Sequence, residues 1–569
     1  MYSTARWLFG LVVAIAFQVT SVAWAASPEA VHGQHGMVAS RSALASQVGA
    51  DIMRGGGNAI DAAVATGFAL AVTYPDAGNL GGGGFMVIRL ADGRVVTNDH
   101  RERAPAGAQR DMYLDASGNV VAGRSTQTHL AAGVPGSVAG MLDVLEKYGT
   151  LPRKTIMAPA IRLASDGFVL NGDLAEQFGE AAEEFSKHAG SARVFLKKDG
   201  GRYRPGDRFK QPELARTLEL IAAKGKDGFY TGKTADLIVA EMKRGGGLIS
   251  AADLADYKSV WREPIKGQYR GYQIYSMAPP SSGGVLLVQM LNMLEPFDIK
   301  ASGYGSAATI HLMVEAERRA YADRAEYLGD PDFYPVPIAK LTDKRYAVQR
   351  FSDFDATRAT LSTSVGPGLA REESPQTTHF SVMDAAGNAV ACTTTLNLSF
   401  GSKIVVEGAG FLLNNEMDDF SARANTPNSY GLIGRVANSI EPNKRMLSSM
   451  TPTIVVDSEG RTRLVTGSPG GSTIITTVLQ IVINVIDHGM DVSDAVGAPR
   501  FHHQWMPDRV VYEPWGISPD TLKILQSRGH TFVPLPWGRG IGDANTVMRS
   551  GDDLLGMSDP RNRGGAAGY

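Results

Sequence analysis

Apolar and polar residues alternate along two segments near the middle of the chain, and this period of two predicts a pair of β-strands. In residues 376–383, Phe380 and Val382 alternate with polar residues. The sequence Asp-Ala-Ala-Gly-Asn at 384–388 is typical of a turn, and β-branched residues resume over 389–395. We therefore expect a β-hairpin at this point of the chain.

The length of the turn decides which residues of the hairpin face each other. If the loop comprises residues 384–388, Met383 pairs with Ala389 and, counting back, Thr377 lies opposite Thr395. A slip of one residue would turn the other face of the strand inward, so the register is open at this point. In either register, a hydroxyl at the start of one strand lies beside a hydroxyl at the end of its partner.

The first part of the chain predicts a strand-like start and two helices over residues 37–75. Ser42 is expected to begin the first helix, the glycines at 55–57 to end it, and Asn58 to cap the second helix. A further run of glycines leads into an apolar segment at 85–88, which predicts a buried strand.

The rest of the chain mixes helices and strands. Residues 134–326 are mostly helical in pattern, interrupted by a strand-like segment at 269–274, and the apolar run 474–486 predicts a buried helix. Four further segments are expected to be strands: 403–406, 411–413, 453–456 and 462–465. Strands flanked by helices in this way indicate an α/β fold, a layered sandwich.

Length and composition indicate a soluble globular protein. The chain has 569 residues, so we expect one large core or two closely packed parts. It is 43% hydrophobic and 20% charged, with a formal net charge of −2, which argues against a nucleic-acid partner held through phosphate contacts. No internal repeat or interdomain linker is evident.

The amino terminus predicts export. Arg6 precedes an apolar stretch over 8–22, and Ala-Trp-Ala at 23–25 is a small-x-small cleavage signal, so residues 1–25 are interpreted as a signal peptide. An uncleaved membrane anchor is the competing interpretation, but the apolar run is short for a spanning helix. We expect a periplasmic or secreted protein without a membrane segment after cleavage. Its single cysteine, Cys392, is expected to be a small core residue.

Other sequence features suggest cofactor chemistry but do not complete a pattern. Residues 227–234 approach a phosphate-binding loop, yet the first required glycine is replaced by Asp227. His311 and Glu315 lie four residues apart on a predicted helix, but no second histidine completes a zinc pattern, so we expect a surface pair. We predict no metal and no organic cofactor.

A threonine hydroxyl is a weak nucleophile near neutral pH and needs a base. Cutting the chain before a threonine supplies one, because the freed α-amine can take the hydroxyl proton. Threonines are also common strand residues, so the hairpin alone does not establish catalysis. By the same reasoning, Arg101 could belong to an exposed charged turn, residues 417–419 to a solvated acidic turn, and Gly470 with Gly471 to an ordinary turn before a helix.

Several longer motifs narrow these alternatives. They are Gln-Thr-Thr-His-Phe-Ser-Val at 376–382, Thr-Leu-Asn at 395–397, Asn-Asn-Glu-Met-Asp-Asp-Phe at 414–420, Pro-Asn-Lys-Arg-Met-Leu-Ser-Ser-Met at 442–450 and Gly-Ser-Pro-Gly-Gly-Ser at 467–472. With these motifs in this order, the chain from about Gly36 to Tyr569 resembles the γ-glutamyltranspeptidase family. Several long motifs in order are far more specific than any one of them.

The resemblance implies a fold and a maturation step. The fold would be the αββα sandwich of N-terminal nucleophile hydrolases. The chain would cut itself between Gln376 and Thr377, giving a large subunit (26–376) and a small catalytic subunit (377–569) that remain together as a heterodimer. Thr377 would then cleave the γ-glutamyl amide of glutathione and related compounds, passing the acyl group to water or to amino acids and peptides.

The resemblance also implies roles for individual residues. Thr395 would hydrogen-bond the nucleophile, with Thr378 as the alternative neighbour, and the backbone amides of Gly470 and Gly471 would bind the oxyanion. The remaining roles concern the glutamyl group: Arg101, Ser448 and Ser449 for its α-carboxylate, Asp419, Asn397 and Glu416 for its α-ammonium, and Tyr430 in a lid loop at 425–435. Some members of the family carry glutamine at the position of Glu416, so the glutamate here alters the charge balance.

Three other functions compete with this one. An acylase of the same superfamily would accept glutaryl side chains, as in cephalosporin precursors, but such a substrate lacks the α-ammonium that Asp419 would bind. A poly-γ-glutamate depolymerase is a second possibility, although the predicted lid favours small substrates. A catalytically silent protein that binds amino acids or peptides is the third, and the intact Gln-Thr junction argues against it.

Overall fold

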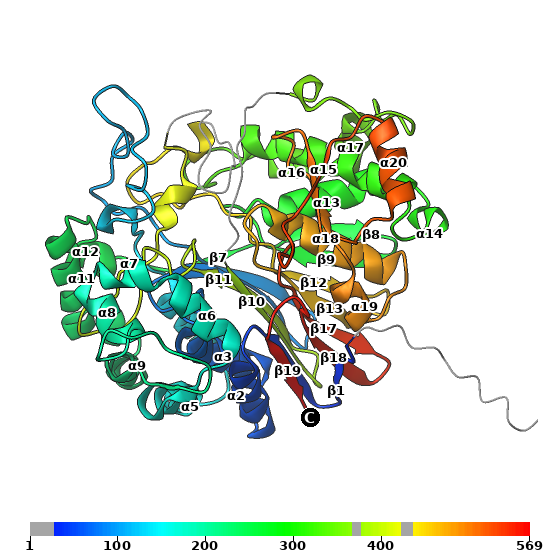
Figure 1. The fold of residues 1–569 in the computed structure, drawn as a ribbon. Coiled ribbons are helices and arrows are strands. Elements are labelled where there is room, and N and C mark those ends of the chain that lie inside the picture. The colour runs from blue at the N-terminus through cyan, green and yellow to red at the C-terminus, as the bar shows by residue number, and fades with distance from the viewer. Residues whose placement is uncertain (1–27, 367–376, 423–435) are drawn as a thin grey trace, which may run out of the picture.

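Two seven-stranded antiparallel sheets lie face to face, and helices cover both outer faces (Figure 1). The computed structural model describes residues 28–366, 377–422 and 436–569. The first sheet has the order β19 (Gly565–Gly568), β2 (Gly36–Ser40), β10 (Thr378–Asp384), β11 (Ala389–Thr395), β3 (Gly83–Arg89), β4 (Val95–His100) and β7 (Val260–Arg262). The second has the order β1 (Val31–Gly33), β18 (Asp553–Ser558), β17 (Asn545–Ser550), β13 (Thr462–Thr466), β12 (Thr453–Val456), β9 (Tyr272–Ser276) and β8 (Ile265–Tyr269).

Side chains of each strand point alternately to the two faces of its sheet, so each sheet contributes to two hydrophobic layers. In β3, Phe85 and Val87 pack between the sheets, whereas Met86 and Ile88 face the helices outside. The second sheet contributes residues such as Ile454 to the same inner layer. Because side chains of a strand point alternately to opposite faces, a strand buried on both sides is apolar throughout. This accounts for the apolar run at 85–88.

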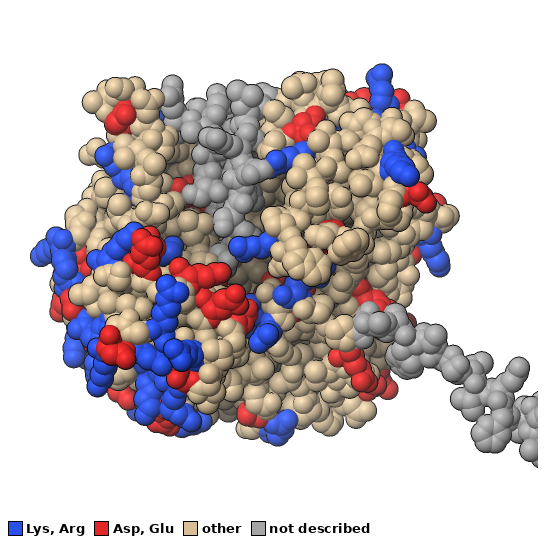
Figure 2. Space-filling model, viewed as in Figure 1, with Lys and Arg blue, Asp and Glu red and all other residues tan. Residues whose placement is uncertain are grey.

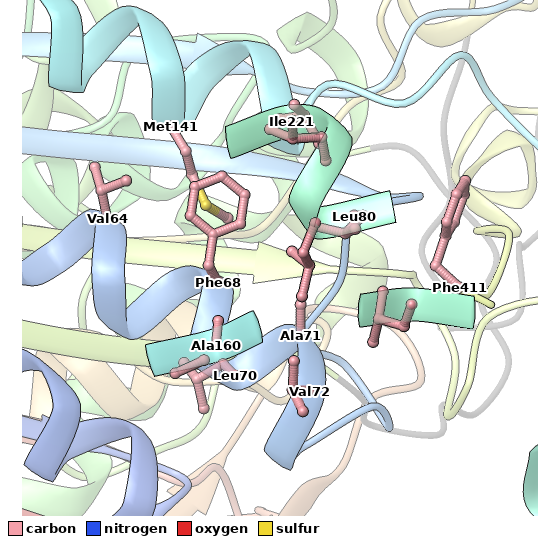
Figure 3. Close-up of a cluster of buried hydrophobic side chains, with 14 of the residues drawn as sticks. Val64, Phe68, Leu70, Ala71, Val72, Leu80, Met141, Ala160, Ile221 and Phe411 are labelled. Carbon is pink, nitrogen blue, oxygen red and sulfur yellow. The ribbon is translucent and has the colours of Figure 1, made fainter. Parts of the chain in front are cut away.

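Helices near the amino end of the chain cover the first sheet. They are α2 (Ala43–Arg54), α3 (Ala59–Thr73), α4 (Ser137–Tyr148), α5 (Arg153–Asp166), α6 (Gly172–Glu180), α7 (Ala182–Ser186), α8 (Ala189–Phe195), α9 (Pro212–Lys224), α10 (Asp227–Tyr230), α11 (Gly232–Gly245) and α12 (Ala251–Ala255). Every residue of α3 is buried, and Phe68 packs among Val64, Met141 and neighbouring apolar side chains (Figure 3). Its many alanines allow this close packing from all sides.

A second group of helices covers the other sheet. It comprises α13 (Gly283–Leu294), α14 (Ile299–Ser302), α15 (Ala307–Tyr327), α16 (Ile338–Leu341), α17 (Lys344–Arg350), α18 (Thr473–Ile486), α19 (Val492–Gly497) and α20 (Pro519–Ser527). Small elements complete the fold: β5 (Phe168–Val169) with β6 (Arg208–Phe209), β14 (Phe501–His502) with β15 (Val510–Tyr512) and β16 (Phe532–Pro534), and the 3₁₀ turns η1 (His129–Ala131), η2 (Ser362–Ser364), η3 (Glu416–Asp419) and η4 (Val436–Asn438). The architecture is therefore the expected α/β sandwich of four layers.

Several local predictions are confirmed. Met383 pairs with Ala389, so the hairpin has the expected register. Ser42 caps α2, and Asn58 caps α3 through a capping box in which its side chain and that of Asp61 each accept a backbone N–H. The apolar run near the end of the chain forms the buried helix α18, and Cys392 is fully buried in β11.

One predicted strand is confirmed in part and two are wrong. The segment 269–274 includes the end of β8 and the start of β9, but Arg270 and Gly271 between them adopt positive φ and reverse the chain. Segments 403–406 and 411–413 form no ladder and share only an isolated bridge between Val405 and Leu412. Their apolar side chains are buried by helices around them rather than by strand pairing.

The prediction that His311 and Glu315 form a surface pair is also wrong. Both side chains are buried, with 1% and 0% of their area exposed. Their burial is compensated by partners distant in sequence: His311 Nδ1 lies 2.6 Å from His530 Nε2, and Glu315 Oε1 accepts a hydrogen bond of 3.1 Å from the N–H of Thr360. A polar residue can be buried where such partners satisfy it.

Within the three described ranges, no helix has both the length and the apolar character needed to cross a lipid bilayer. The predicted signal peptide at 1–25 lies outside the described residues and stays a prediction.

Candidate active site

Thr377 and Thr395 meet at one end of the central hairpin. Thr378 pairs with Thr394, and one residue further along the Oγ of Thr377 donates a hydrogen bond of 3.4 Å to the Oγ of Thr395. The Thr395 hydroxyl also accepts the N–H of Asn397 at 2.8 Å. The register therefore brings together the two hydroxyls that the spacing predicted, and the backbone holds the second in a fixed position.

Thr378 does not replace Thr395 as the neighbour of Thr377. Adjacent residues of a strand point to opposite faces, and the Thr378 hydroxyl is buried without a hydrogen-bond partner among the described residues. On the other side of the site, Asn79 donates to the carbonyl oxygen of Thr395 at 2.8 Å and to the Oγ of Thr394 at 3.1 Å. Asn79 thus fixes the end of β11, a role that no sequence motif signalled.

The nearest histidine in sequence, His379, is unsuited to act as a base. Its two ring nitrogens lie 2.8 Å from the Oγ of Thr393 and 3.0 Å from the Oγ of Ser381, so both are engaged. Burial lowers the pKa of His379 to about 3, which keeps the ring neutral. Its place in the sheet is structural.

Two consecutive glycines approach Thr377 from the amino-terminal end of α18. Gly470 and Gly471 adopt φ values of +135° and +57°, which L side chains rarely adopt. A Cβ on Gly470 would also lie 2.3 Å from the Oγ of Thr473. Neither backbone N–H is bonded to another residue of the described part of the chain, so the pair can donate to an oxyanion formed at Thr377.

Arg101 lies at the centre of a buried cluster of charges rather than in an exposed turn. Its guanidinium has 1% of its area exposed and lies 2.6 Å from Glu416, 2.5 Å from Asp419 and 3.6 Å from Glu102. The Nε and Nη2 atoms also donate to the carbonyl oxygens of Met446 and Leu447, both at 3.3 Å. One fixed positive charge is therefore surrounded by three carboxyl groups.

These carboxyl groups titrate far from their usual range. Burial raises the pKa of Asp419 to about 6 and that of Glu102 to about 8, although Arg101 acts in the opposite direction. Burial likewise raises the pKa of Glu416 well above its usual range. Arg324 also acts on Asp419, but these positive charges do not offset the burial of three carboxyls, so part of the cluster is protonated near neutral pH. A ligand's positive charge would favour ionisation of the rest.

The serines and a further arginine border the same space. Arg324 donates from Nη2 to the Oγ of Ser449 at 3.0 Å and from Nε to the Oγ of Ser282 at 2.9 Å. The Ser448 hydroxyl accepts the N–H of Met450 at 3.1 Å. Arg324 was not predicted as a site residue. It comes from α15, within a run of alternating charges that reads in sequence as an ordinary helix surface.

Thr377 lines two cavities. The small cavity collects most of the predicted site residues: Arg101, Thr377, Thr395, Asn397, Glu416, Asp419, Ser448, Ser449 and Gly471, together with Arg324. The large cavity has a volume of about 600 Å³ and is lined by Thr377, Gly470, Phe400, Lys403, Arg539 and Asp543, among others. Gln376 and Tyr430 lie outside the described residues.

The large cavity is strongly charged. Figure 2 shows acidic and basic side chains gathered around a hollow near the middle of this face, close to α6 in Figure 1. The acidic wall comes from Asp173, Glu176 and Glu180 on α6. A polar cavity beside an activated hydroxyl is suited to small polar substrates.

A group of potential metal ligands lies elsewhere, in the described part of the second helical layer. His311, Glu315 and His530 bring their ligand atoms within 4.8 Å of one another. The Glu315 carboxylate is already held by Arg318 and Arg319, whose charges oppose a cation at this place. The contacts of the cluster are those of a structural hydrogen-bond network.

Comparison with known proteins gives a consistent result. The family model described as gamma-glutamyltranspeptidase matches residues 45–569. The glutathione hydrolase proenzyme of Escherichia coli (strain K12) is 53% identical over 533 residues, which cover 93% of this chain and 91% of the relative. Among solved structures, the gamma-glutamyltranspeptidase of Helicobacter pylori is 50% identical, with a TM-score of 0.57, and covers 57% of this chain and 93% of its own.

A more distant structure matches the fold over a greater length. The cephalosporin acylase from Bacillus halodurans is 27% identical, with a TM-score of 0.85, and covers 97% of this chain and 99% of its own. Two structures with different named activities thus share this architecture, so the fold alone does not decide the substrate.

Proposed function

The chain belongs to the γ-glutamyltranspeptidase family and has the N-terminal nucleophile hydrolase fold, and on this basis we propose that Thr377 carries both its maturation and its catalysis. The protein is an autoprocessed enzyme that hydrolyses or transfers γ-glutamyl groups. The assignments of single residues that follow belong to the proposal.

In maturation, the Oγ of Thr377 attacks the carbonyl carbon of Gln376. The new C–O bond forms as the C–N bond breaks, and the proton of the hydroxyl passes to the departing nitrogen, which becomes the α-amine of Thr377. Water then hydrolyses the ester. The products are a large subunit of residues 26–376 and a small subunit of residues 377–569, which remain joined by the interleaved strands of both sheets.

In turnover, the new α-amine takes the proton from the Oγ of Thr377 as that oxygen attacks the γ-carbonyl carbon of the donor. The N–H groups of Gly470 and Gly471 stabilise the oxyanion, and each such donor typically contributes about 100-fold or more in rate. The C–N bond of the donor breaks, its nitrogen leaves with a proton, and a γ-glutamyl ester of Thr377 remains. Water or an acceptor amine then attacks this ester.

Recognition of the glutamyl head group depends on opposite charges in the small cavity. Arg101, with Ser448 and Ser449, would bind the α-carboxylate, because a guanidinium presents two parallel donors to a carboxylate. Asp419, with Glu416 and Asn397, would bind the α-ammonium. The observation that carries the proposal is the cluster of one guanidinium and three carboxyls beside Thr377, which suits a zwitterion.

The same cluster argues against a glutaryl acylase. A glutaryl group would bring a carboxylate to Arg101 but no ammonium to Asp419, which would then remain beside Glu416 without a new positive charge. Burial first, and neighbouring carboxylates second, already raise the pKa of Asp419 and that of Glu416, and a glutaryl group would bring no positive charge to offset either cause. Glutathione and related γ-glutamyl compounds are therefore the substrates we propose, with amino acids or peptides as acceptors.

Two further expectations complete the proposal. Residues 1–25 would direct the chain out of the cytoplasm, to the periplasm or the medium, and be removed. The loop at 425–435, with Tyr430, would act as a lid over the small cavity.

Assays with purified protein test the function directly. We expect release of glutamate from glutathione, and γ-glutamylglycylglycine when glycylglycine is added. Mass spectrometry of the same sample should find a chain that begins at Thr377. Full activity from a chain that remains uncut would overturn the proposed mechanism, and activity on glutaryl amides alone would favour the acylase.

A further inference from the structure

The two cavities meet at Thr377, and this arrangement assigns the two halves of the substrate. In acyl transfer, the acyl part and the amine part extend in different directions from the carbonyl carbon that is attacked. If the small cavity holds the γ-glutamyl group, as proposed above, the large cavity is left for the amine part. Its volume of about 600 Å³ is within the range of about 300–1,000 Å³ found for small-molecule sites.

The cations that line the large cavity fall into two classes. Arg41 lies 2.6 Å from Asp173 and 2.8 Å from Asp543, and Arg561 likewise has carboxylate partners. These two are neutralised within the protein. Lys403 and Arg539, in contrast, have no carboxylate within 4.0 Å in the described ranges.

Of these two, Lys403 is the one fixed in place. It follows β11 in a tight turn with φ +63°, where its N–H donates to the carbonyl of Phe400 at 2.9 Å and its own carbonyl accepts the Oγ of Ser191 at 2.8 Å. Its side chain is half-buried, whereas Arg539 is exposed at the edge of the cavity. Burial lowers the pKa of Lys403, and the charges of Glu184 and Asp76, neither within 4.0 Å of its ammonium, only partly offset this effect.

The wall of the large cavity also offers buried acceptors. Asp76 and Asp543 line it with 1% and 5% of their area exposed, and the Oδ1 atom of each has no hydrogen-bond partner among the described residues. A buried polar atom without a partner is costly, so a group that bonds to it on binding gains affinity. Both Oδ1 atoms are turned away from solvent, so a rotation of the carboxylate would be needed before either could accept an N–H group of an amino acid or peptide.

We propose that Lys403 determines the specificity for the amine part, both as leaving group and as acceptor, by binding a carboxylate on it. The favoured ligands are short peptides, whose reacting nitrogen lies at Thr377 while the carboxyl-terminal carboxylate lies at Lys403. This inference rests on the proposed function, since it assumes that the acyl part occupies the small cavity.

The test pairs two acceptors that differ only in this carboxylate, glycylglycine and glycylglycinamide. For each, kcat/KM of transfer is measured with the wild-type heterodimer and with Lys403→Met. The wild type should prefer the acid by about tenfold, the usual value of one hydrogen bond to a charged group. Lys403→Met should reduce this preference to less than about twofold, and Lys403→Arg should restore most of it.

The matched control is Lys243→Met, because Lys243 is exposed on α11 outside the large cavity and should leave the preference unchanged. A wild type that uses both acceptors equally well would overturn the inference, whether or not the variants fold. The inference would also be overturned if Lys403→Met kept the preference for glycylglycine, or if Arg539→Met lost that preference instead. Complete absence of γ-glutamyl turnover in the wild type would reject the proposed function itself, which keeps the two failures distinct.

Discussion

Arg101 and Asp419 form an ion pair beside the nucleophile, with 2.5 Å between the guanidinium Nη2 and the carboxylate Oδ2; the arginine side chain is 1% exposed and the aspartate 12%. The two residues are 318 positions apart in sequence and would come from different subunits after cleavage. A ligand that carries both a carboxylate and an ammonium can pair the carboxylate with Arg101 and the ammonium with Asp419. Neither residue then loses its counter-charge when the ligand binds. The pair therefore links assembly of the two subunits to recognition of the substrate.

Replacing Asp419 tests whether its carboxylate binds the ammonium of the substrate. Asp419→Ala should lower kcat/KM for a γ-glutamyl anilide by about 100-fold or more, because removal of one partner of a buried charge pair costs about 2–5 kcal/mol. Maturation should proceed, since Asp419 has no part in cleavage at Thr377. The control is Asp520→Ala, which removes a carboxylate that is 93% exposed on α20. Equal damage to cleavage and turnover would mean that Asp419 has a structural role.

Replacing Thr377 tests maturation. Thr377→Ala should give a single uncut chain on a denaturing gel, because no other hydroxyl replaces its Oγ. Thr377→Ser should still be cut. Thr378→Ala removes the neighbouring hydroxyl, which points to the other face, and should yield two bands like the wild type. A cut Thr377→Ala protein, or an uncut Thr378→Ala protein that is otherwise folded, would contradict the assignment of the nucleophile.

Replacing Thr395 tests the hydroxyl that faces the nucleophile. Thr395→Ala should slow both cleavage and turnover by about tenfold, the value of one hydrogen bond of about 1.4 kcal/mol. Thr395→Ser keeps the hydroxyl and should recover most of the rate. The measurement is the time course of cleavage together with kcat for hydrolysis. If alanine and serine have the same effect, the methyl group matters and the hydrogen bond does not.

The hairpin could be predicted from sequence because its signals are local. The turn at 384–388 fixes the loop length, and the period of two then places Thr377 opposite Thr395 by counting alone. The capped helices α2 and α3 were predictable for the same reason, since Ser42 and Asn58 act on backbone groups two or three residues away.

The remainder depends on contacts between distant residues. Arg324 and Glu315 lie on one helix with a charged, water-soluble pattern, yet both are buried. Ser282 and Ser449 accept hydrogen bonds from Arg324, and the N–H of Thr360 donates to Glu315. Partners that lie far apart in sequence cannot be predicted from the local pattern of apolar and polar residues. The strand predicted at 403–406 fails likewise, because its apolar side chains are covered by helices. The motifs that resemble a known family located Arg101 and Asp419, which composition and period had left as surface charges.

The glycine pair can be tested by adding a single methyl group. Gly470→Ala should reduce turnover by at least about 100-fold, because the φ of +135° disfavours a side chain and the displaced amide can no longer meet the oxyanion. Gly107→Ala is the control, since Gly107 lacks a positive φ and its nearest neighbour would be 3.8 Å from the new Cβ. A thermal melt should be nearly unchanged in Gly107→Ala and should move to a lower temperature in Gly470→Ala, because the new side chain is strained there. Turnover is therefore compared at a temperature at which both variants are folded. Normal kcat in Gly470→Ala would show that its amide does not bind the oxyanion.

The raised pKa of Asp419 predicts a pH dependence of binding. Below about pH 6 this carboxyl is protonated and cannot pair with an ammonium, and above it the ionised form can. Between pH 7 and pH 5, the inhibition constant of L-glutamate against a γ-glutamyl anilide should therefore rise by about tenfold, as one proton binds to the free site. The ammonium and the α-carboxylate of the ligand do not titrate in this range, so the change reports on the protein. In Asp419→Asn, L-glutamate should inhibit weakly, and its inhibition constant should be nearly independent of pH. If the inhibition constant of this variant still changes near pH 6, another group is responsible for the titration.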